Sequence, residues 1–334
     1  MKIGIVNDLP LAVEALRRAL SLHRDHQVVW VARDGREAIE FCAAHTPDVV
    51  LMDLIMPNVD GVEATRQIMA HSPCAILVVT VDVGVHAGRV YEAMGAGALD
   101  AIDTPQLGSG EVQKTAAALL AKIDQIGGVI GDRVVPLRLP ATARSAVTEH
   151  VPLVAIGASA GGPAALATLL AGLPADFGAA TVIIQHVDCA FAAGMAEWLS
   201  QVSTLPVRLA KGGDRPQAGV VLLAGTNDHL QLMSAGTLGY TVDPADTPYR
   251  PSVDVFFHSV VQRWRGRAVG VLLTGMGRDG AHGLKAMREK GYYTIAQDEA
   301  TSAVYGMPKT AAALDAAVAI LPLSGIANAL VRTL

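Results

Sequence analysis

The chain has 334 residues, a formal charge of −5 at pH 7, and a composition that is 51% hydrophobic but only 4% aromatic. This length exceeds what one hydrophobic core usually supports, so we expect two domains. Neither half is basic, which argues against a nucleic-acid-binding surface. Ala, Val, Leu and Gly dominate the composition, as is typical of parallel strands covered by helices, so the predicted class is α/β.

The cysteines and the N-terminus bear on the cellular compartment. Cys42, Cys74 and Cys189 have neither the paired count of a disulfide framework nor the spacing of metal ligands, so reduced thiols are predicted. The apolar stretch before Asn7 and Asp8 is too short for a signal peptide, and no later apolar run approaches the ~18 residues of a membrane span. We expect a cytoplasmic protein without membrane insertion.

Short β-branched runs alternate with helical stretches through the first part of the chain. Strands are expected at 2–6, 27–32, 48–53, 75–80 and 98–102, and helices at 11–20, 36–45, 61–70, 86–94 and 111–123. Such alternation predicts a parallel sheet with right-handed crossovers and helices on both faces.

The alternation stops at a segment rich in Gly, Pro and small polar residues, which predicts a linker. A second βα series opens with a strand near Val151 and a helix over 164–173, with further strands at 181–186, 220–225 and 268–275. We therefore predict a first domain over 1–122, a linker over 123–149, and a second, doubly wound parallel-sheet domain over 150–334.

Three polar residues of the first half stand at predicted strand ends, where the chemistry of open parallel sheets collects. They are Asp8, Asp53 and Thr80. Two carboxylates brought together in this way can hold Mg²⁺, and one of them can accept a phosphoryl group while the metal neutralises the developing charge. Asp53 is the better acceptor candidate, whereas Asp8 alone is equally well explained as a helix cap.

The segment LMDLIMPNVDG around Asp53, together with Asp8, Thr80 and the five βα units, resembles the response-regulator receiver domain over about 1–122. The resemblance implies a flavodoxin-like (βα)5 fold and transfer of phosphate from a CheA-type histidine kinase to Asp53. It also implies Mg²⁺ binding by Asp8 and Asp53, and a switch in which Thr80 turns toward the phosphoryl group.

Three positions depart from the receiver pattern. Asn7 stands where a second acidic residue is usual, which removes a negative charge from the metal site. Thr104 occupies the place of the lysine whose ammonium pairs with the phosphoryl oxygens, and Ala101 occupies the aromatic switch position. These departures put into question how phosphorylation is coupled to a conformational change.

The second half contains a G-x-S-x-G segment centred on Ser159, between a predicted strand and a predicted helix. This is the context of a nucleophile elbow, in which small neighbours permit a sharp turn that exposes the hydroxyl. The helix that follows would aim its amide dipoles at an oxyanion. The pattern alone is weak, because a glycine-rich turn of this kind also cradles phosphate, although the P-loop lysine is absent.

A serine nucleophile needs a base and an orienting carboxylate. Among the histidines of this half, His186 ends the strand that follows the Ser159 unit, so it should reach the same sheet edge. Asp279 follows the strand at 268–275 and is the preferred carboxylate. Asp254, which a helix N-cap explains, and Asp228, which a turn explains, remain alternatives.

Five segments in this order, IGASAGG, IIQH, RPSVDVFFHS, LLTGMGRDGA and YGMPKTA, resemble the CheB-type chemotaxis methylesterases over about 150–334. The resemblance implies Ser159 as nucleophile, His186 as base, Asp279 as its orienting group and the Met276 amide as an oxyanion donor. Ala160 stands where the family commonly has Thr. NDLP near the start and IDTP near residue 104 look most like the branch that serves Wsp-type pathways.

The implied reaction is hydrolysis of glutamate methyl esters, and possible deamidation of glutamines, on the cytoplasmic helices of a methyl-accepting chemoreceptor. No cofactor is implied for the esterase. One rival hypothesis is a response regulator that acts only by binding protein, and a second keeps the enzyme but makes the receiver a phosphate-independent cover. DNA-binding output is disfavoured because the second half offers no basic helix-turn-helix.

Overall fold

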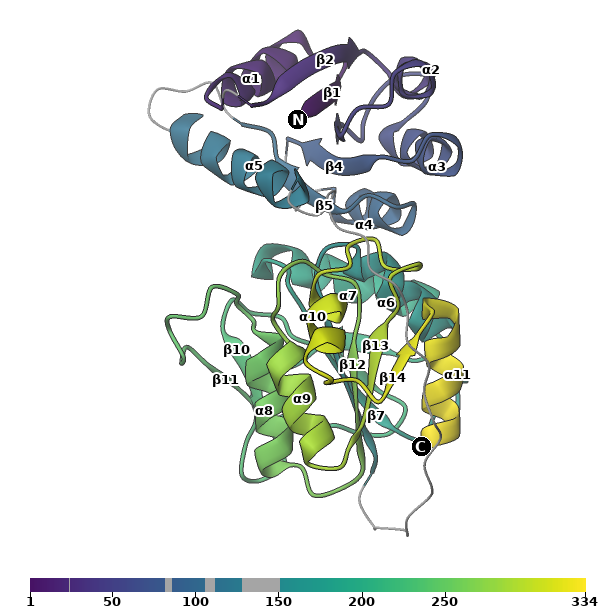
Figure 1. Ribbon diagram of the computed structural model, residues 1–334, viewed down its shortest axis with the longest axis vertical. Helices are drawn as coiled ribbons and strands as arrows, with labels where there is room; N and C mark the ends of the chain where they lie inside the picture. Colours follow the sequence, from purple (N-terminus) through teal and green to yellow (C-terminus); the bar gives the residue numbers. More distant parts are fainter. Residues whose placement is uncertain (24, 82–85, 106–111, 128–150) are drawn as a thin grey trace. The chain divides into compact units, whose positions relative to one another are not determined.

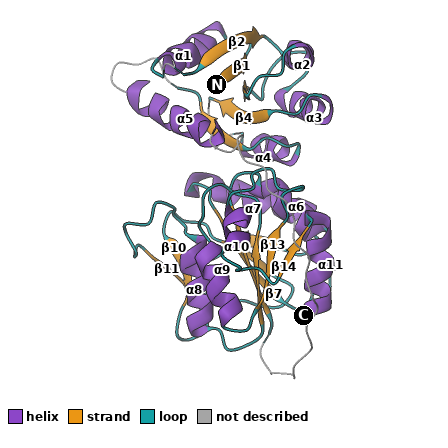
Figure 2. Ribbon diagram, viewed as in Figure 1, coloured by secondary structure: helices purple, strands orange, loops and turns teal. Residues whose placement is uncertain are grey.

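The computed structural model describes residues 1–23, 25–81, 86–105, 112–127 and 151–334 (Figure 1). The chain divides into two compact units, Met1–Asp132 and Arg133–Leu334. Each unit is an α/β structure with helices on both faces of a parallel sheet, as expected (Figure 2). Most of the predicted linker lies outside the described residues.

The first unit contains a five-stranded sheet in the order β2-β1-β3-β4-β5, in which every pairing is parallel. Its strands are β1 Lys2–Val6, β2 Gln27–Ala32, β3 Val49–Met52, β4 Ala75–Thr80 and β5 Asp100–Asp103. Its helices are α1 Pro10–Ser21, α2 Gly35–Ala44, α3 Gly61–His71, α4 Ala87–Gly95 and α5 Val112–Gly127. Helix α5 thus continues past residue 122, where the domain was predicted to end.

The core of the first unit follows from strand alternation. Ile3 and Ile5 of β1 are fully buried against α1 and α5, in a cluster that includes Leu16 and Leu119. The same sheet is covered on its other face by α2, α3 and α4 (Figure 1). Because both faces are covered, β3 is an uninterrupted apolar run, Val49–Met52, rather than an alternating one.

The second unit contains a seven-stranded parallel sheet in the order β14-β13-β12-β6-β7-β9-β8, with a separate antiparallel pair, β10-β11. The strands are β6 Leu153–Ala158, β7 Ala180–Gln185, β8 Val207–Leu209, β9 Val221–Leu223, β10 His229–Leu232, β11 Leu238–Thr241, β12 Ala268–Leu272, β13 Tyr293–Gln297 and β14 Ala319–Leu321. The helices are α6 Gly162–Ala171, α7 Cys189–Val202, α8 Val253–Arg263, α9 Ala281–Glu289, α10 Met307–Ala313 and α11 Leu323–Thr333.

The central strand β6 is buried on both faces. Leu153 and Ala155 belong to a core shared with α8, α9 and α10, whereas the intervening Val154 and Ile156 point to the opposite face and are also fully buried. On that opposite face, α6 packs against α7 and against α11. The sheet order places β6 between β12 and β7, so the carboxyl ends of these three strands meet at one edge.

Among the described residues, no helix combines the length and the apolar character that crossing a membrane requires.

Candidate functional site

Ser159 lies in the turn between β6 and α6. Its backbone N–H donates to Thr274 O (3.1 Å) and its carbonyl accepts from Gly162 N (2.7 Å), which makes the turn tight. Gly161 has a φ of 73°, and a Cβ there would lie 2.5 Å from Ala303 Cβ, so only glycine suits the position. The turn leaves Ser159 partly exposed at the start of α6, as the elbow motif predicted.

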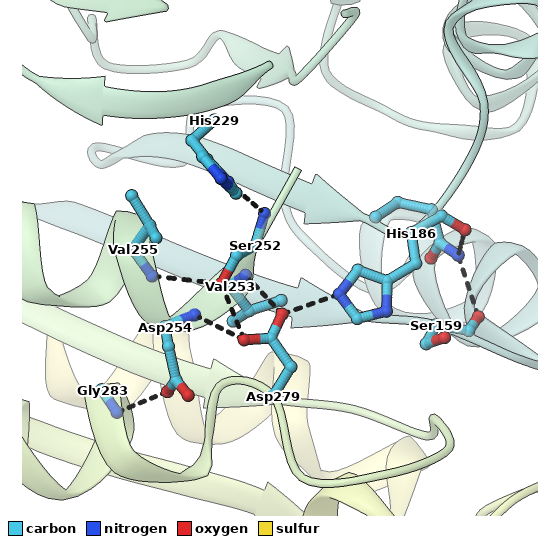
Figure 3. A network of polar contacts seen from close by, with 10 residues as sticks. Ser159, His186, His229, Ser252, Val253, Asp254, Val255, Asp279 and Gly283 are labelled. Carbon is cyan, nitrogen blue, oxygen red and sulfur yellow. Dashed lines mark hydrogen bonds and ion pairs between the residues drawn. The ribbon is translucent and has the colours of Figure 1, made fainter. Parts of the chain in front are cut away.

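His186 is placed by the register of β6 and β7. Ala158 pairs with Gln185, so the next residues along the two strands, Ser159 and His186, leave the sheet side by side. The Gln185 side chain fixes both turns, because its Nε2 donates to Ser159 O (2.9 Å) and His186 O (3.2 Å). Figure 3 shows Ser159 and His186 at the edge of the sheet.

Asp279 reaches the same edge from the loop that connects β12 to α9. His186 Nε2 lies 2.8 Å from Asp279 Oδ2, and the His186 side chain is only 11% exposed (Figure 3). The other ring nitrogen, Nδ1, is buried without a hydrogen-bond partner in the described part of the chain. Nδ1 is therefore the nitrogen that can accept a hydrogen bond from the Ser159 hydroxyl. A catalytic hydrogen bond of this kind often forms only once substrate is bound.

The N-terminus of α8 holds Asp279 in place. The backbone N–H groups of Val253 (2.7 Å) and Asp254 (3.1 Å) and the hydroxyl of Ser252 (2.8 Å) all donate to its carboxylate. Burial alone would raise the pKa of Asp279, but the His186 hydrogen bond and charge, with the Val253 and Ser252 donors, outweigh it and lower the pKa below its ordinary value. Asp279 is thus kept ionised beside His186.

Asp254, the rival carboxylate, has a different task. The prediction that it caps α8 is wrong, because Ser252 is the N-cap residue and Asp254 lies in the first turn. The Asp254 carboxylate instead accepts from Gly283 N (2.6 Å), which joins α8 to α9. Burial raises the pKa of Asp254, although the hydrogen bond from Gly283 opposes the shift. Asp254 thus holds Asp279 through its backbone N–H, and its carboxylate forms no hydrogen bond or ion pair with His186 within the described residues.

Two further residues complete the network, and sequence reasoning missed the contribution of both. Tyr249 stacks flat on the His186 ring, with centroids 4.7 Å apart and planes 4° apart. His229 is fully buried and accepts from Ser252 N through Nδ1 (3.1 Å), so its Nε2 carries the proton toward Pro244 O (3.2 Å). The run of prolines around Tyr249, in TPYRPS, was the available signal for an irregular segment placed against a site.

Met276 was expected to supply an oxyanion donor. Gly275 comes so close to the elbow that a Cβ there would lie 2.8 Å from Ser159 Cβ, and Gly275 O accepts from Gly306 N and Met307 N. The next amide, that of Met276, donates to no hydrogen bond among the described residues. The loop therefore presents a free N–H group next to Ser159.

The first unit brings Asn7, Asp8 and Asp53 together at the ends of β1 and β3. Asp53 is only 6% exposed and accepts from Leu54 N (2.7 Å) and from Asn7 Nδ2 (3.0 Å). Burial and the neighbouring charge of Asp8 raise the pKa of Asp53, although the Leu54 amide opposes them. A divalent cation such as Mg²⁺, which prefers oxygen ligands, would neutralise the negative charge of the Asp8 and Asp53 carboxylates.

The switch positions lie on the neighbouring strands β4 and β5. Thr80 is buried, and its carbonyl accepts from Thr104 N (2.8 Å), so the two threonines are adjacent. Thr104 Oγ1 is buried and has no hydrogen-bond partner in the described residues, and Ala101 is 7% exposed. No cation therefore occupies the place of the usual lysine at residue 104.

One unit thus has the buried Asp53 and the exposed Asp8 at the edge of a five-stranded parallel sheet. The other has a serine, a histidine and an aspartate in the loops that follow three adjacent strands. Together they define a receiver-type domain joined to a hydrolase-type domain. Residues 154–330 match the CheB methylesterase family, and residues 3–109 match the response regulator receiver domain. The chain belongs to the CheB methylesterase family.

Relatives and a solved structure agree with this assignment. A protein-glutamate methylesterase/protein-glutamine glutaminase of Burkholderia thailandensis is 66% identical over 99% of this chain and 97% of its own length, and one from Burkholderia orbicola is also 66% identical over the same shares. The CheB methylesterase catalytic domain of Thermotoga maritima is 32% identical, with a TM-score of 0.52, and the match covers 56% of this chain and all of that domain.

Proposed function

We propose that this protein hydrolyses glutamate methyl esters, and deamidates glutamines, on the cytoplasmic helices of a chemoreceptor, with Ser159 as nucleophile. The observation that carries the proposal is the 2.8 Å contact between His186 Nε2 and Asp279, which leaves the buried Nδ1 of His186 facing the serine turn (Figure 3). The names of the relatives supply the reaction class.

In the proposed mechanism, His186 Nδ1 takes the proton from Ser159 Oγ as the oxygen attacks the γ-carboxyl carbon of the ester. The oxyanion that forms is stabilised by the Met276 amide and the N-terminal dipole of α6. The protonated ring then delivers its proton to the leaving methoxide, and methanol departs. Water attacks the acyl-serine by the same proton transfers in reverse order, which releases glutamate.

Asp279 stabilises the imidazolium that appears in each half of the reaction, and it fixes which ring nitrogen faces Ser159. Because Asp279 accepts from Nε2, the ring is held with its Nδ1 free of a proton before attack. A glutamine substrate would follow the same course with ammonia as the leaving group.

For the receiver, we propose phosphorylation of Asp53 by a CheA-type kinase. Asp8 and Asp53 would hold Mg²⁺, which when bound neutralises charge at the transferring phosphoryl group. The fit rests on the two carboxylates at adjacent strand ends and on the raised pKa of Asp53. The cytoplasmic location and the Wsp-type pathway remain predictions.

A second hypothesis for the receiver is regulation without phosphate. It is favoured by the small Ala101 and by the buried Thr104 Oγ1, which finds no hydrogen-bond partner in the described part of the chain. Full-length wild type and Asp53→Ala would be compared with and without a small acyl-phosphate donor. A rate that the donor raises only in wild type supports phosphorylation control, and rates unaffected in both proteins support the phosphate-independent receiver.

The esterase proposal is tested by incubating methylated receptor with wild type, Ser159→Ala and, as a control, Ser324→Ala, and by measuring methanol. Ser324 is an exposed serine of α11. We expect release by wild type and by the control and none by Ser159→Ala. Equal release from all three proteins would remove Ser159 from the mechanism.

A further inference from the structure

A cluster of two histidines and an aspartate lies in the receiver unit, apart from the residues at Asp53. His23 and His26 flank the turn between α1 and β2, and Asp124 lies on α5. One nitrogen of each ring and one oxygen of the carboxylate all lie within 4.8 Å of one another. The mechanism proposed above uses none of these residues.

The imidazole of the buried member of the cluster forms no hydrogen bond within the described residues. The His26 side chain is 2% exposed, yet neither of its ring nitrogens has a hydrogen-bond partner in the described part of the chain. A polar group buried in this way costs free energy unless something satisfies it. His23 Nδ1 is likewise buried and without a partner.

The contact between His26 and Asp124 does not have the geometry of a hydrogen bond. His26 Nε2 lies 3.2 Å from Asp124 Oδ1, but the oxygen is off the line along which that nitrogen would donate. Two ligands of one tetrahedral ion, each ~2.0–2.1 Å from it, lie roughly 3.3 Å apart with the ion between them. The observed separation is that of two ligands of a common ion.

We propose that His23, His26 and Asp124 form a binding site for a divalent transition-metal ion of the zinc class, which ties the turn between α1 and β2 to α5. Two imidazoles and one carboxylate are the ligands that such ions prefer, whereas Mg²⁺ prefers oxygen alone. The site is therefore chemically distinct from the two carboxylates at Asp8 and Asp53.

Two further features agree with a metal ligand role. The rings of His23 and His26 are stacked, with centroids 4.4 Å apart. His23 is 38% and Asp124 49% exposed, so these two side chains can rotate toward an ion held by His26.

The test is calorimetric titration of Zn²⁺ into the full-length, chelator-treated protein with Mg²⁺ in excess, so that oxygen-only sites are occupied. Wild type would be compared with Asp124→Asn, with His23→Asn combined with His26→Asn, and with His71→Asn. His71 is an exposed histidine of α3 and serves as the matched control.

We expect one equivalent of Zn²⁺ to bind wild type and His71→Asn, and the other two variants to bind at least ~10-fold more weakly, since each lacks a direct ligand. Zn²⁺ binding of equal strength in wild type and in Asp124→Asn would overturn the proposal, as would the lack of one-equivalent binding to wild type. Asp124→Asn changes an exposed side chain, so it decides the matter even if the double variant does not fold.

Discussion

Asp53 and Asp279 are both almost fully buried at the end of a parallel strand, yet their pKa values move in opposite directions. Asp279 receives three donors from the start of α8 and a fourth from His186, which together outweigh the cost of burial. Asp53 has two close donors and the negative Asp8 beside it, so burial prevails. Burial alone therefore does not decide how a carboxylate behaves.

The difference shows two ways to prepare a site for chemistry. The protein itself completes the environment of Asp279, which suits a group that must hold the same geometry through every turnover. The environment of Asp53 is left incomplete, and the missing charge is one that a metal ion and a phosphoryl group can bring. Substitutions at the two sites should therefore have different effects.

The largest effect is expected from Asp279→Asn. The amide cannot stabilise the imidazolium and can favour the wrong ring tautomer of His186, so we expect kcat for methanol release to fall by about 10³ to 10⁴-fold. Asp315→Asn, which alters an exposed partner of Arg288, is the control and should leave the rate unchanged. A fall of less than tenfold in Asp279→Asn would show that this carboxylate does not orient the base.

A smaller loss is expected from Tyr249→Ala, which removes the ring stacked on His186 and frees the imidazole to tilt. We expect kcat to fall by about tenfold or more while KM changes little, because misplacement of a reacting group by ~1 Å is costly. Tyr249→Phe retains the stacking ring and should keep nearly the wild-type kcat. An equal loss in both variants would assign the effect to the hydroxyl instead.

The opposed pKa shifts predict opposite stability effects at pH 7, measured by calorimetry without Mg²⁺. Because folding raises the pKa of Asp53, its protonated carboxyl contributes to the free energy of unfolding at low pH, and this contribution is lost as pH rises through the raised pKa. At pH 7 the ionised Asp53 is therefore unfavourable, and Asp53→Asn should stabilise the receiver by about 1 kcal/mol. Asp279 has a lowered pKa, so its contribution is present above the ordinary value and is lost as pH falls through the lowered one. Asp279→Asn should therefore destabilise the second unit.

The pH dependence provides the control for that pair. The stability difference between wild type and each variant should shrink toward acid, where both aspartates become protonated. Differences of the same sign in the two variants, or differences that do not vary with pH, would contradict the contrast between the two sites.

The smallest effect is expected from Thr104→Lys, which restores a cation next to Thr80. An ammonium at this position can pair with the phosphoryl oxygens, so stimulation of methanol release by an acyl-phosphate donor should exceed that of wild type. Thr104→Met, of similar length without charge, is the control. Equal stimulation in all three proteins would show that the missing lysine does not limit the response.

Much of the fold followed from local pattern. The alternation of β-branched runs and helical stretches predicted both parallel sheets, and the position of Ser159, His186 and Asp279 at strand ends predicted that they would converge. Strands can bring residues together in this way without being consecutive in the sequence, because β12 pairs with β6 although it lies much later in the chain. The ends of parallel strands meet at one edge whatever their order.

What escaped prediction depends on packing between distant segments. Tyr249 lies in an irregular, proline-rich stretch that has no periodicity to interpret, and its stacking on His186 is set by the fold of that stretch. Ser252 was not identified as the cap of α8, although its hydroxyl joins the cap to Asp279. The His23, His26 and Asp124 cluster brings the turn after α1 next to α5, which sequence spacing does not reveal.

His186 and Asp279 are 93 residues apart in the chain, yet each leaves the sheet beside Ser159. The segment between them forms α7, the strands β8 and β9, the β10-β11 hairpin, α8 and the central strand β12. It also contains Tyr249, which stacks on His186, and Ser252, which donates to Asp279, so the same segment that separates the two groups holds both in place.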